Sequence, residues 1–356
     1  MAKIIQVLVV DDSTFMRKSL SAMLTSDPRI AVAGLARNGE EALQQVKALK
    51  PDVVTMDVEM PGMNGIEAVR RIMAECPVPI VMVSSLTTEG AGDTLKALEY
   101  GAVDFIPKQL DGVATNIVEI ERELVAKIVG ASQASGKLAL RRSGTPMAPI
   151  VKPTGGALSA HSISVTRGNR IVAIGSSTGG PQALMDILPM LPADFPAGIV
   201  IVQHMPQSFT KPFADRMNQI CPLEVKEAAD GDEVKAGRVL IAPGGVQFRV
   251  KKKSITTNVV SLSPNYEKHL HAPAADIMLQ SVAALYGERG IGVILTGMGH
   301  DGLEGMKAMK ASKGRTIVQD EKTCIVYGMP KAVVEAGYAD KVVPLPHIVG
   351  EILNMV

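Results

Sequence analysis

The fold of the amino-terminal part is decided by the stretch IQVLVVDD at residues 5–12, an apolar run that ends in two aspartates. A short run of β-branched and aliphatic residues predicts a buried strand. Four similar runs follow, each succeeded by an amphipathic stretch, so we expect five βα pairs that form a parallel sheet of order 2-1-3-4-5 covered on both faces. The other predicted strands are residues 31–36, 53–56, 80–83 and 103–106.

Polar side chains end several of these predicted strands. Asp11 and Asp12 end the first strand and Asp57 ends the third, so their carboxylates converge at the carboxyl edge of the sheet, where such sheets bind ligands. Three carboxylates at one place repel one another unless a hard cation such as Mg²⁺ binds there. Ser84 ends the fourth strand and Lys108 follows the fifth. A single aspartate at a strand end more often caps the next helix, but the whole set suits an acyl phosphate on Asp57.

The first half resembles response-regulator receivers through LVVDDS, DVEMPGMNG, VMVSS and VDFIPK, over residues 1–125. The resemblance implies a flavodoxin-like fold, phosphorylation by a histidine kinase and a bound Mg²⁺. One departure is that Pro107 precedes Lys108, whereas receivers usually carry lysine followed by proline. The implied roles are phospho-acceptor for Asp57, metal ligands for Asp11, Asp12 and Asp57, switching hydroxyl for Ser84, switching aromatic for Phe105 and phosphate partner for Lys108.

A change of composition separates two halves of the chain. Residues 130–168 contain no acid and five bases, and Gly, Pro, Ser and Thr fill 18 of these 39 positions. Such a segment buries too little apolar surface to offset its ordering entropy, which predicts a flexible linker. We therefore expect a receiver at residues 1–128, a linker at 129–168 and a second domain at 169–356.

The second half returns to alternating strands and helices, which predicts a doubly wound, mostly parallel α/β domain. An expected hairpin at residues 247–260 interrupts the pattern, and its lysine run at 251–253 fits a solvated turn or, less simply, a docking patch for an acidic partner. The expected strands are 171–175, 199–203, 239–242, 292–296 and 316–318, and the expected helices are 181–191, 209–220, 276–286, 302–312 and 330–336.

A glycine-rich turn after the first strand of this domain carries two serines. Residues 175–179, GSSTG, fit the G-x-S-x-G pattern of a nucleophile elbow between a strand and a helix. The pattern selects Ser177 over Ser176, and backbone N–H groups at the helix start could stabilise an oxyanion. Glycine-rich turns of this kind also bind phosphate or simply reverse the chain, so the turn alone does not decide for a nucleophile.

A serine needs a base and an orienting acid. His204 ends the next parallel strand, IVIVQH, and Asp301 follows the strand GVILTG, so both can meet Ser177 at one edge. His204 could instead be a structural histidine, and Asp301 could cap a helix beginning near Gly302. Asp276 is a competing carboxylate that we expect to cap its own helix. The order Ser…His…Asp differs from that of α/β-hydrolases, which favours a different fold with convergent chemistry.

The whole chain resembles the chemotaxis response regulator protein-glutamate methylesterase/protein-glutamine glutaminase family through IGSSTGGP, IVQHMP, APGG, LTGMGHDG and QDEKTCIVYGMP. The resemblance implies a phosphorylation-activated hydrolase that removes methyl esters from chemoreceptor glutamates, releases methanol and deamidates receptor glutamines. It implies no cofactor in the esterase site, methylated cytoplasmic receptor helices as substrate, and an unphosphorylated receiver that covers the esterase site. The implied roles are nucleophile for Ser177, base for His204, orienting acid for Asp301, oxyanion donor for the Met298 N–H, and a place in the site for Thr178 and His271.

Three departures from the family pattern concern the esterase site. Ser176 stands where alanine is common, Gln247 stands where histidine often follows the APG turn, and residues 271–276 lack the usual bulkier side chains. The altered stretch at residues 271–276 leaves open an esterase for a different substrate. A second alternative is a receiver-controlled binding module without catalysis, whose glycine turn holds a ligand.

Composition excludes several other classes of protein. The net charge of +1 provides no overall positive potential that would attract nucleic acid. No apolar run approaches the roughly 20 residues of a membrane span. Three scattered cysteines and the absence of a signal peptide pattern predict a cytoplasmic protein without membrane insertion.

Overall fold

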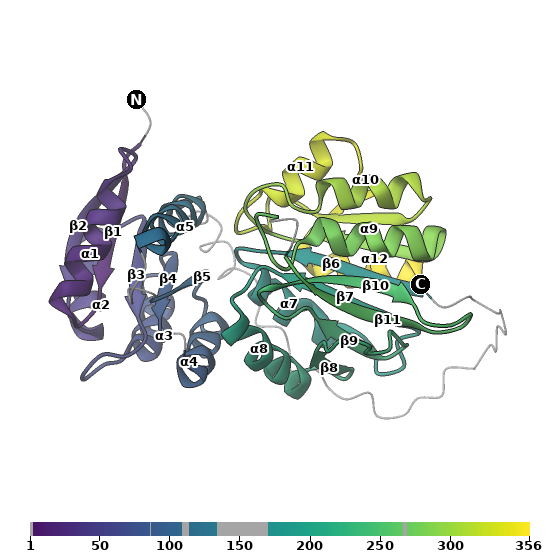
Figure 1. Cartoon of the computed structure of the whole chain (residues 1–356). Coiled ribbons are helices and arrows are strands. Elements are labelled where there is room, and N and C mark those ends of the chain that lie inside the picture. Colours follow the sequence, from purple (N-terminus) through teal and green to yellow (C-terminus); the bar gives the residue numbers. More distant parts are fainter. Residues whose placement is uncertain (1–2, 86, 109–113, 134–169, 266–268) are drawn as a thin grey trace, which may run out of the picture.

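The computed structural model describes residues 3–85, 87–108, 114–133, 170–265 and 269–356, which form two α/β domains side by side (Figure 1). Most of the predicted linker lies outside these residues. Helix α5 (Ala114–Ser132) continues beyond the predicted boundary at residue 128, so residues 129–132 are its last turn rather than linker. Among the described residues, no helix is both long and apolar enough to cross a membrane.

The first domain is a five-stranded parallel sheet in the order β2-β1-β3-β4-β5, as predicted. Apolar side chains of α2, α3 and α4 pack on one face of this sheet, and those of α1 and α5 pack on the other. Each of the first four helices begins behind a Ser, Asn or Thr whose side chain accepts a backbone N–H of the first turn, which stabilises the helix start. The elements are β1 (Ile5–Val10), α1 (Thr14–Thr25), β2 (Ile30–Ala36), α2 (Gly39–Leu49), β3 (Val53–Asp57), α3 (Gly65–Glu75), β4 (Ile80–Ser84), α4 (Thr88–Glu99) and β5 (Asp104–Pro107).

The second domain is built on a seven-stranded parallel sheet in the order β14-β13-β12-β6-β7-β9-β8. The central strands β6, β7 and β12 are almost wholly buried, which agrees with their continuous apolar sequences. The strands are β6 (Arg170–Ser176), β7 (Ala197–Gln203), β8 (Glu224–Glu227), β9 (Arg238–Ile241), β12 (Gly290–Ile294), β13 (Arg315–Gln319) and β14 (Lys341–Val343).

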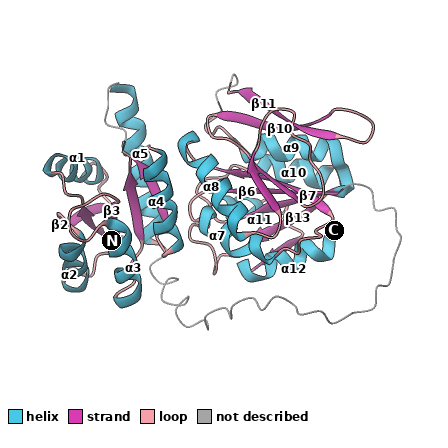
Figure 2. Cartoon of the chain, turned by 90° about the horizontal axis from the view of Figure 1, so that it is seen from below, coloured by secondary structure: helices cyan, strands magenta, loops and turns pink. Residues whose placement is uncertain are grey.

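Helices cover both faces of this sheet (Figure 2). Apolar residues of α7, α8 and α12 pack on one face, and those of α9, α10, α11 and the antiparallel hairpin β10–β11 pack on the other. The expected hairpin is therefore present, with its lysine run exposed where β10 ends. The elements are α7 (Gly180–Ile187), η1 (Leu188–Met190), α8 (Gln207–Ile220), β10 (Val246–Lys252), β11 (Asn258–Pro264), α9 (Ala275–Tyr286), η2 (Gly287–Arg289), α10 (Leu303–Ala311), α11 (Met329–Glu335) and α12 (Leu345–Met355).

The two domains pack directly against each other, with α4 against α8 in both views (Figures 1 and 2). The rings of Phe105 on β5 and Phe209 on α8 stack with centroids 4.2 Å apart. The Arg216 guanidinium on α8 makes a bidentate ion pair with Glu99 at the end of α4, at 2.5 and 3.1 Å. The carboxyl-terminal part of α5 packs on Val326 of the second domain. The contact surface of the first domain is therefore α4, β5 and α5.

Candidate active site and phosphorylation site

The serine turn lies where β6 ends and α7 begins. Ser177 follows the last residue of β6, and its N–H donates to the Thr296 carbonyl at 3.1 Å. Gly179 has φ of 77°, a left-handed conformation that favours glycine, and the helix begins at the next residue. The turn thus has the strand–turn–helix form that the sequence predicted, with Ser177 at the carboxyl edge of the sheet.

His204 lies beside this turn because β6 and β7 are neighbours. Ser176 and Gln203, the last residues of the two strands, are paired in register. The His204 N–H donates to the Ser176 carbonyl at 3.1 Å. Ser177 and His204 therefore leave adjacent strand ends at the same edge, as expected from the sequence.

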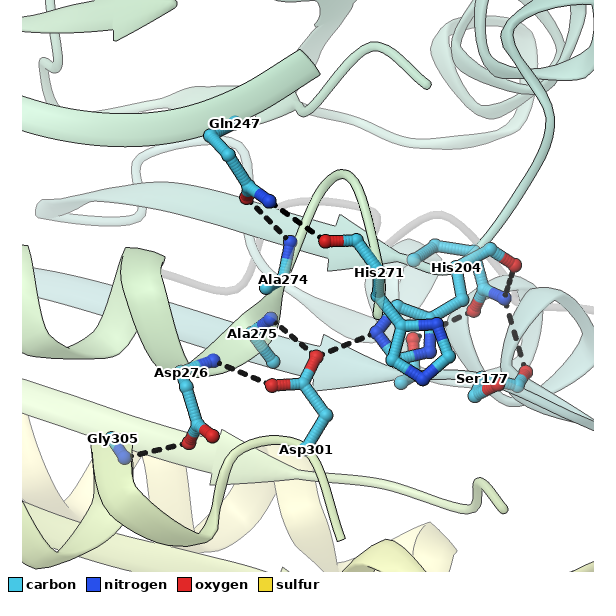
Figure 3. A network of polar contacts seen from close by, with 11 residues as sticks. Ser177, His204, Gln247, His271, Ala274, Ala275, Asp276, Asp301 and Gly305 are labelled. Atoms are coloured by element: carbon cyan, nitrogen blue, oxygen red, sulfur yellow. Dashed lines mark hydrogen bonds and ion pairs between the residues drawn. The ribbon is translucent and has the colours of Figure 1, made fainter. Parts of the chain in front are cut away.

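Asp301 holds the His204 ring from the far side (Figure 3). The distance between His204 Nε2 and Asp301 Oδ2 is 2.7 Å, and both side chains are about nine-tenths buried. The N–H groups of Ala275 and Asp276, at the start of α9, donate to the two Asp301 oxygens at 2.6 and 2.9 Å. Burial alone would raise the pKa of Asp301, but the bonds from His204 and from these N–H groups lower it to about 2. Asp301 is therefore an ionised acceptor for the imidazole.

Asp276 does not cap its own helix as expected. Its Oδ1 accepts the Gly305 N–H of α10 at 2.7 Å, while Asp301, which precedes α10, accepts the first N–H groups of α9. Asp276, in the first turn of α9, thus caps α10, and Asp301, before α10, caps α9. We call this arrangement the crossed caps. Burial, with the nearby charge of Asp301, raises the pKa of Asp276 to about 6.

His271 stacks on His204, with ring centroids 3.9 Å apart and planes 20° from parallel. Burial, together with the charge of His204, lowers the pKa of His271 to about 4, so this ring is neutral near pH 7. The side chain of Gln247 holds the loop that carries it: Nε2 donates to the His271 carbonyl at 2.7 Å, and Oε1 accepts the Ala274 N–H at 3.0 Å. The Gln247 departure from the family pattern therefore supports the position of His271.

The backbone around Met298 lies against the serine. A Cβ added at Gly297 would come within 2.9 Å of Ser177 Cβ, and the Met298 side chain is 38% exposed. Within the described residues the Met298 N–H has no protein acceptor, so it can serve a ligand. Thr178 is 3% exposed and its carbonyl accepts the Thr296 hydroxyl at 2.9 Å. The structure thus brings all six predicted residues of this site to one edge of the sheet.

The acid cluster of the first domain also forms as expected. Oxygen atoms of Asp11, Asp12 and Asp57 lie within 4.8 Å of one another, and Lys108 Nζ lies 2.7 Å from Asp57 and 3.0 Å from Asp11. Burial raises the pKa of Asp57 to about 6 despite this lysine. The three carboxylates offer only oxygen ligands, which suit a hard divalent cation such as Mg²⁺. Lys108 reaches Asp57 at 2.7 Å, so the inverted order of Pro107 and Lys108 does not prevent this contact.

Ser84 and Phe105 lie at the edge between the acid cluster and the second domain. The buried Ser84 hydroxyl lies 3.2 Å from the carbonyls of Ser85 and Gly90 and can donate its one proton to either, while Phe105 is 2% exposed and stacks on Phe209. The aromatic predicted to switch is thus part of the contact between the domains.

Comparisons with known proteins identify the families of both domains. The family model described as CheB methylesterase matches residues 172–352, and that of the response regulator receiver domain matches residues 7–116. A protein-glutamate methylesterase/protein-glutamine glutaminase of Oleidesulfovibrio alaskensis is 48% identical over 99% of both chains. The chain belongs to this methylesterase family. The member from Pyrococcus horikoshii is 47% identical over 98% of this chain and 92% of its own.

A solved structure supports the same assignment for the second domain. The CheB methylesterase catalytic domain of Thermotoga maritima is 46% identical to this chain, with a TM-score of 0.52, and the match covers 53% of this chain and all of that one. The predicted fold class and the predicted enzyme class of the methylesterase family are confirmed.

The roles of three residues that support the methylesterase site were not predicted from the sequence. The roles of Gln203, Gln247 and Asp276 depend on partners that are distant in sequence, and no local motif names those partners. The one sequence signal for Gln203 is that a polar glutamine ends the otherwise apolar strand IVIVQ.

Proposed function

We propose that this chain removes methyl groups from glutamate γ-methyl esters of chemoreceptors, and deamidates receptor glutamines, with Ser177, His204 and Asp301 as its catalytic residues. One observation carries the proposal. His204 Nε2 is bonded to the ionised Asp301, while its other ring nitrogen, Nδ1, is buried beside the serine turn and has no hydrogen-bond partner among the described residues. A buried nitrogen left open in this way is available for a proton from Ser177.

The proposed reaction passes through an acyl-enzyme. His204 Nδ1 accepts the Ser177 hydroxyl proton as the serine oxygen attacks the γ-carbonyl carbon of the ester. The resulting oxyanion accepts hydrogen bonds from backbone donors near Met298. The C–O bond to the methoxy group then breaks, and the proton on His204 passes to the leaving oxygen, so methanol departs. Water repeats these steps on the acyl-enzyme and restores Ser177. For a glutamine substrate the leaving group is ammonia.

Asp57 is the proposed phosphorylation site, with a histidine kinase as the donor. Asp11, Asp12 and Asp57 would hold Mg²⁺, which supplies positive charge to phosphoryl oxygens when bound. Lys108, already 2.7 Å from Asp57, adds a second positive charge. Ser84 lies at the end of the neighbouring strand, where it can meet a phosphoryl oxygen. The predicted cytoplasmic location, where kinase and receptor helices would be reached, stays a prediction.

The contact between the domains supports control of the esterase by the receiver. Phe209, which stacks on the receiver's Phe105, belongs to α8, and this helix begins three residues after His204. We propose that a receiver docked in this position hinders the approach of a receptor helix to Ser177, because α8 leads directly from the strand end that carries His204. Phosphorylation that weakens docking by about 1.4 kcal/mol raises the open population tenfold.

The test is methanol release from purified membranes that contain methylated receptors, with the full chain and a small phosphodonor. The unchanged protein should release methanol faster with the donor than without it. Ser177→Ala should release none and should still become phosphorylated at Asp57. Methanol release by Ser177→Ala at the unchanged rate would refute the catalytic assignment.

A second measurement separates the proposal from its two alternatives. A fluorophosphonate should label Ser177, since an activated serine reacts with it and a serine that merely binds a ligand does not. Labelling without methanol release from any methylated receptor would indicate an esterase for another substrate. Absence of labelling in the phosphorylated protein would indicate a binding module.

A further inference from the structure

Gln203 occupies an unusual place for a buried amide. It is the last residue of β7, directly before His204, and it is 2% exposed. Its partner in register is Ser176, the last residue of β6 and directly before Ser177. The residues that precede the proposed nucleophile and the proposed base are therefore side by side.

The Gln203 side chain joins the backbones of the proposed nucleophile and the proposed base. Its Nε2 donates to the Ser177 carbonyl and to the His204 carbonyl, each at 3.0 Å. Its Oε1 accepts the Ser176 hydroxyl at 2.7 Å. Both N–H groups and the oxygen of the amide are thus used, which a buried amide requires.

The orientation of this amide follows from the chemistry of its neighbours. The two carbonyl oxygens can only accept, so they must face the NH₂ group, and Oε1 must face the Ser176 hydroxyl. The reversed amide would place Oε1 against two carbonyl oxygens. Ser176 therefore supplies a donor that holds the amide in this orientation.

Gly180 makes room for the same side chain. A Cβ added at Gly180 would lie 2.0 Å from Gln203 Oε1 and 2.8 Å from Ser176 Cβ. The Gly180 N–H also donates to the Ser177 carbonyl at 2.7 Å, beside the bond from Gln203. A glycine at the first position of α7 is thus required by the packing of Gln203.

We infer that Gln203 is a positioning residue for the hydrolysis proposed above, with Ser176 as its orienting partner. One nitrogen tied to the carbonyls of Ser177 and His204 fixes the two backbones relative to each other. The Cβ directions of Ser177 and His204 depend on these two hydrogen bonds, and so does the approach of Ser177 Oγ to His204 Nδ1. The inference rests on the proposed function, because it concerns the geometry of that reaction.

The first test replaces the amide with an apolar side chain in the full-length, phosphodonor-treated protein. Gln203→Leu should lower kcat per fluorophosphonate-titrated active site by about 10- to 100-fold and change KM less than about twofold, because a misplaced reacting atom slows the chemical step. Thr316→Val is the matched control, since Thr316 is also fully buried and hydrogen-bonded in this sheet but lies at its opposite edge. The control should lose stability and keep its kcat per titrated site.

A second variant supplies a readout that loss of stability would not change. In Gln203→Glu, a protonated carboxyl can donate to one of the two carbonyls, whereas an ionised carboxylate repels both. The ratio of its kcat to that of the unchanged protein should therefore fall as the pH rises from 5.5 to 8.5. A ratio that is constant over this range would overturn the inference.

The role of Ser176 is tested by a double-mutant cycle. Ser176→Ala should lower kcat a few-fold in the unchanged background and should have no further effect in the Gln203→Leu background. Equal effects in both backgrounds would remove Ser176 from the inference.

Failure of the inference and failure of the proposed function give different results. If Gln203→Leu keeps full kcat while Ser177→Ala is inactive, the positioning role is wrong and the hydrolase remains. If Ser177→Ala is active, the hydrolysis assignment is wrong and the inference falls with it.

Discussion

At the scale of single residues, the proposed catalytic groups lie at one edge of the sheet and are oriented by groups from other segments of the chain. Ser177, His204 and Asp301 each follow an apolar strand of a parallel sheet, and such strands end at one edge. The donors to Asp301 lie 25 and 26 residues earlier in the chain, so no local pattern joins them to it. The sequence therefore predicts which groups meet, and the structure adds what orients them.

Asp301→Asn should leave the fold intact and lower kcat by about 10³- to 10⁴-fold. The reason is that three N–H donors share the two Asp301 oxygens, and an amide offers only one oxygen. An NH₂ group facing His204 Nε2 would favour the tautomer with a proton on Nδ1, which cannot accept the proton of Ser177. The measurement is methanol release per titrated site, with the thermal midpoint as the control. A loss below tenfold would contradict the proposed role.

Asp276→Asn should make stability less dependent on pH. The folded-state pKa of Asp276 is raised to about 6 by burial, so folded protein binds this proton more tightly than unfolded protein. Its contribution is fully present below the unfolded pKa of 3.8 and is lost as the pH rises to about 6. Asparagine keeps the oxygen that accepts the Gly305 N–H and has no proton to lose.

The check on Asp276→Asn is urea denaturation at pH 4.5 and pH 7.5. The unchanged protein should lose more unfolding free energy between these values than the variant does, by on the order of 1 kcal/mol after screening by solvent. The same pH dependence in both proteins would show that Asp276 ionises normally.

At the scale of elements, the alternation of apolar runs and amphipathic stretches predicted nearly all of the central strands and helices. The edge strands β8 and β14 were missed, because they are short and half-exposed and their sequences lack an apolar run. The end of α5 was placed too early, since its last turn continues into a segment whose composition indicates a linker. The hairpin β10–β11 was expected, but not that Gln247 on β10 holds the loop before α9.

Gln247→Leu should disturb that loop and, through the start of α9, the orientation of Asp301. The variant leaves the His271 carbonyl and the Ala274 N–H without their partner, which costs about 1–3 kcal/mol of unfolding free energy. We expect a kcat about tenfold lower. Gln280→Leu, on the exposed face of α9, is the matched control and should change stability by less than about 0.5 kcal/mol. Equal behaviour of the two variants in steady-state and denaturation measurements would contradict this role.

At the scale of the whole molecule, the contact between the domains could not be read from the sequence. The contact residues come from segments whose sequences resemble ordinary surface helices or a strand end. Only the folded chain brings together Glu99 with Arg216 and Phe105 with Phe209. The resemblance to methylesterases implied that the receiver covers the esterase, but not which side chains make the contact. The structure assigns it to an aromatic stack and a bidentate ion pair.

Reversing one charge of the Glu99–Arg216 ion pair should raise the esterase activity of the unphosphorylated protein, because it weakens the contact between the domains. Glu99→Arg and Arg216→Glu should each raise methanol release without phosphodonor by about 2- to 5-fold, as expected for a partly exposed pair worth about 0.5–1 kcal/mol. The double variant, which restores opposite charges, should return to the low rate. With the phosphodonor, all four proteins should be equally active. Single variants with the original low rate would show that this pair does not contribute to docking.

The crossed caps also bear on how this enzyme should fail when heated. Because α9 begins on Asp301, which precedes α10, and α10 begins on Asp276, which lies in the first turn of α9, neither helix can fray at its start without releasing the other. The His204–Asp301 pair is built into this junction rather than onto a loop at its margin. On heating, the esterase activity and the structure of the esterase domain should then be lost in one transition. A folded but inactive enzyme should not accumulate at temperatures below that transition.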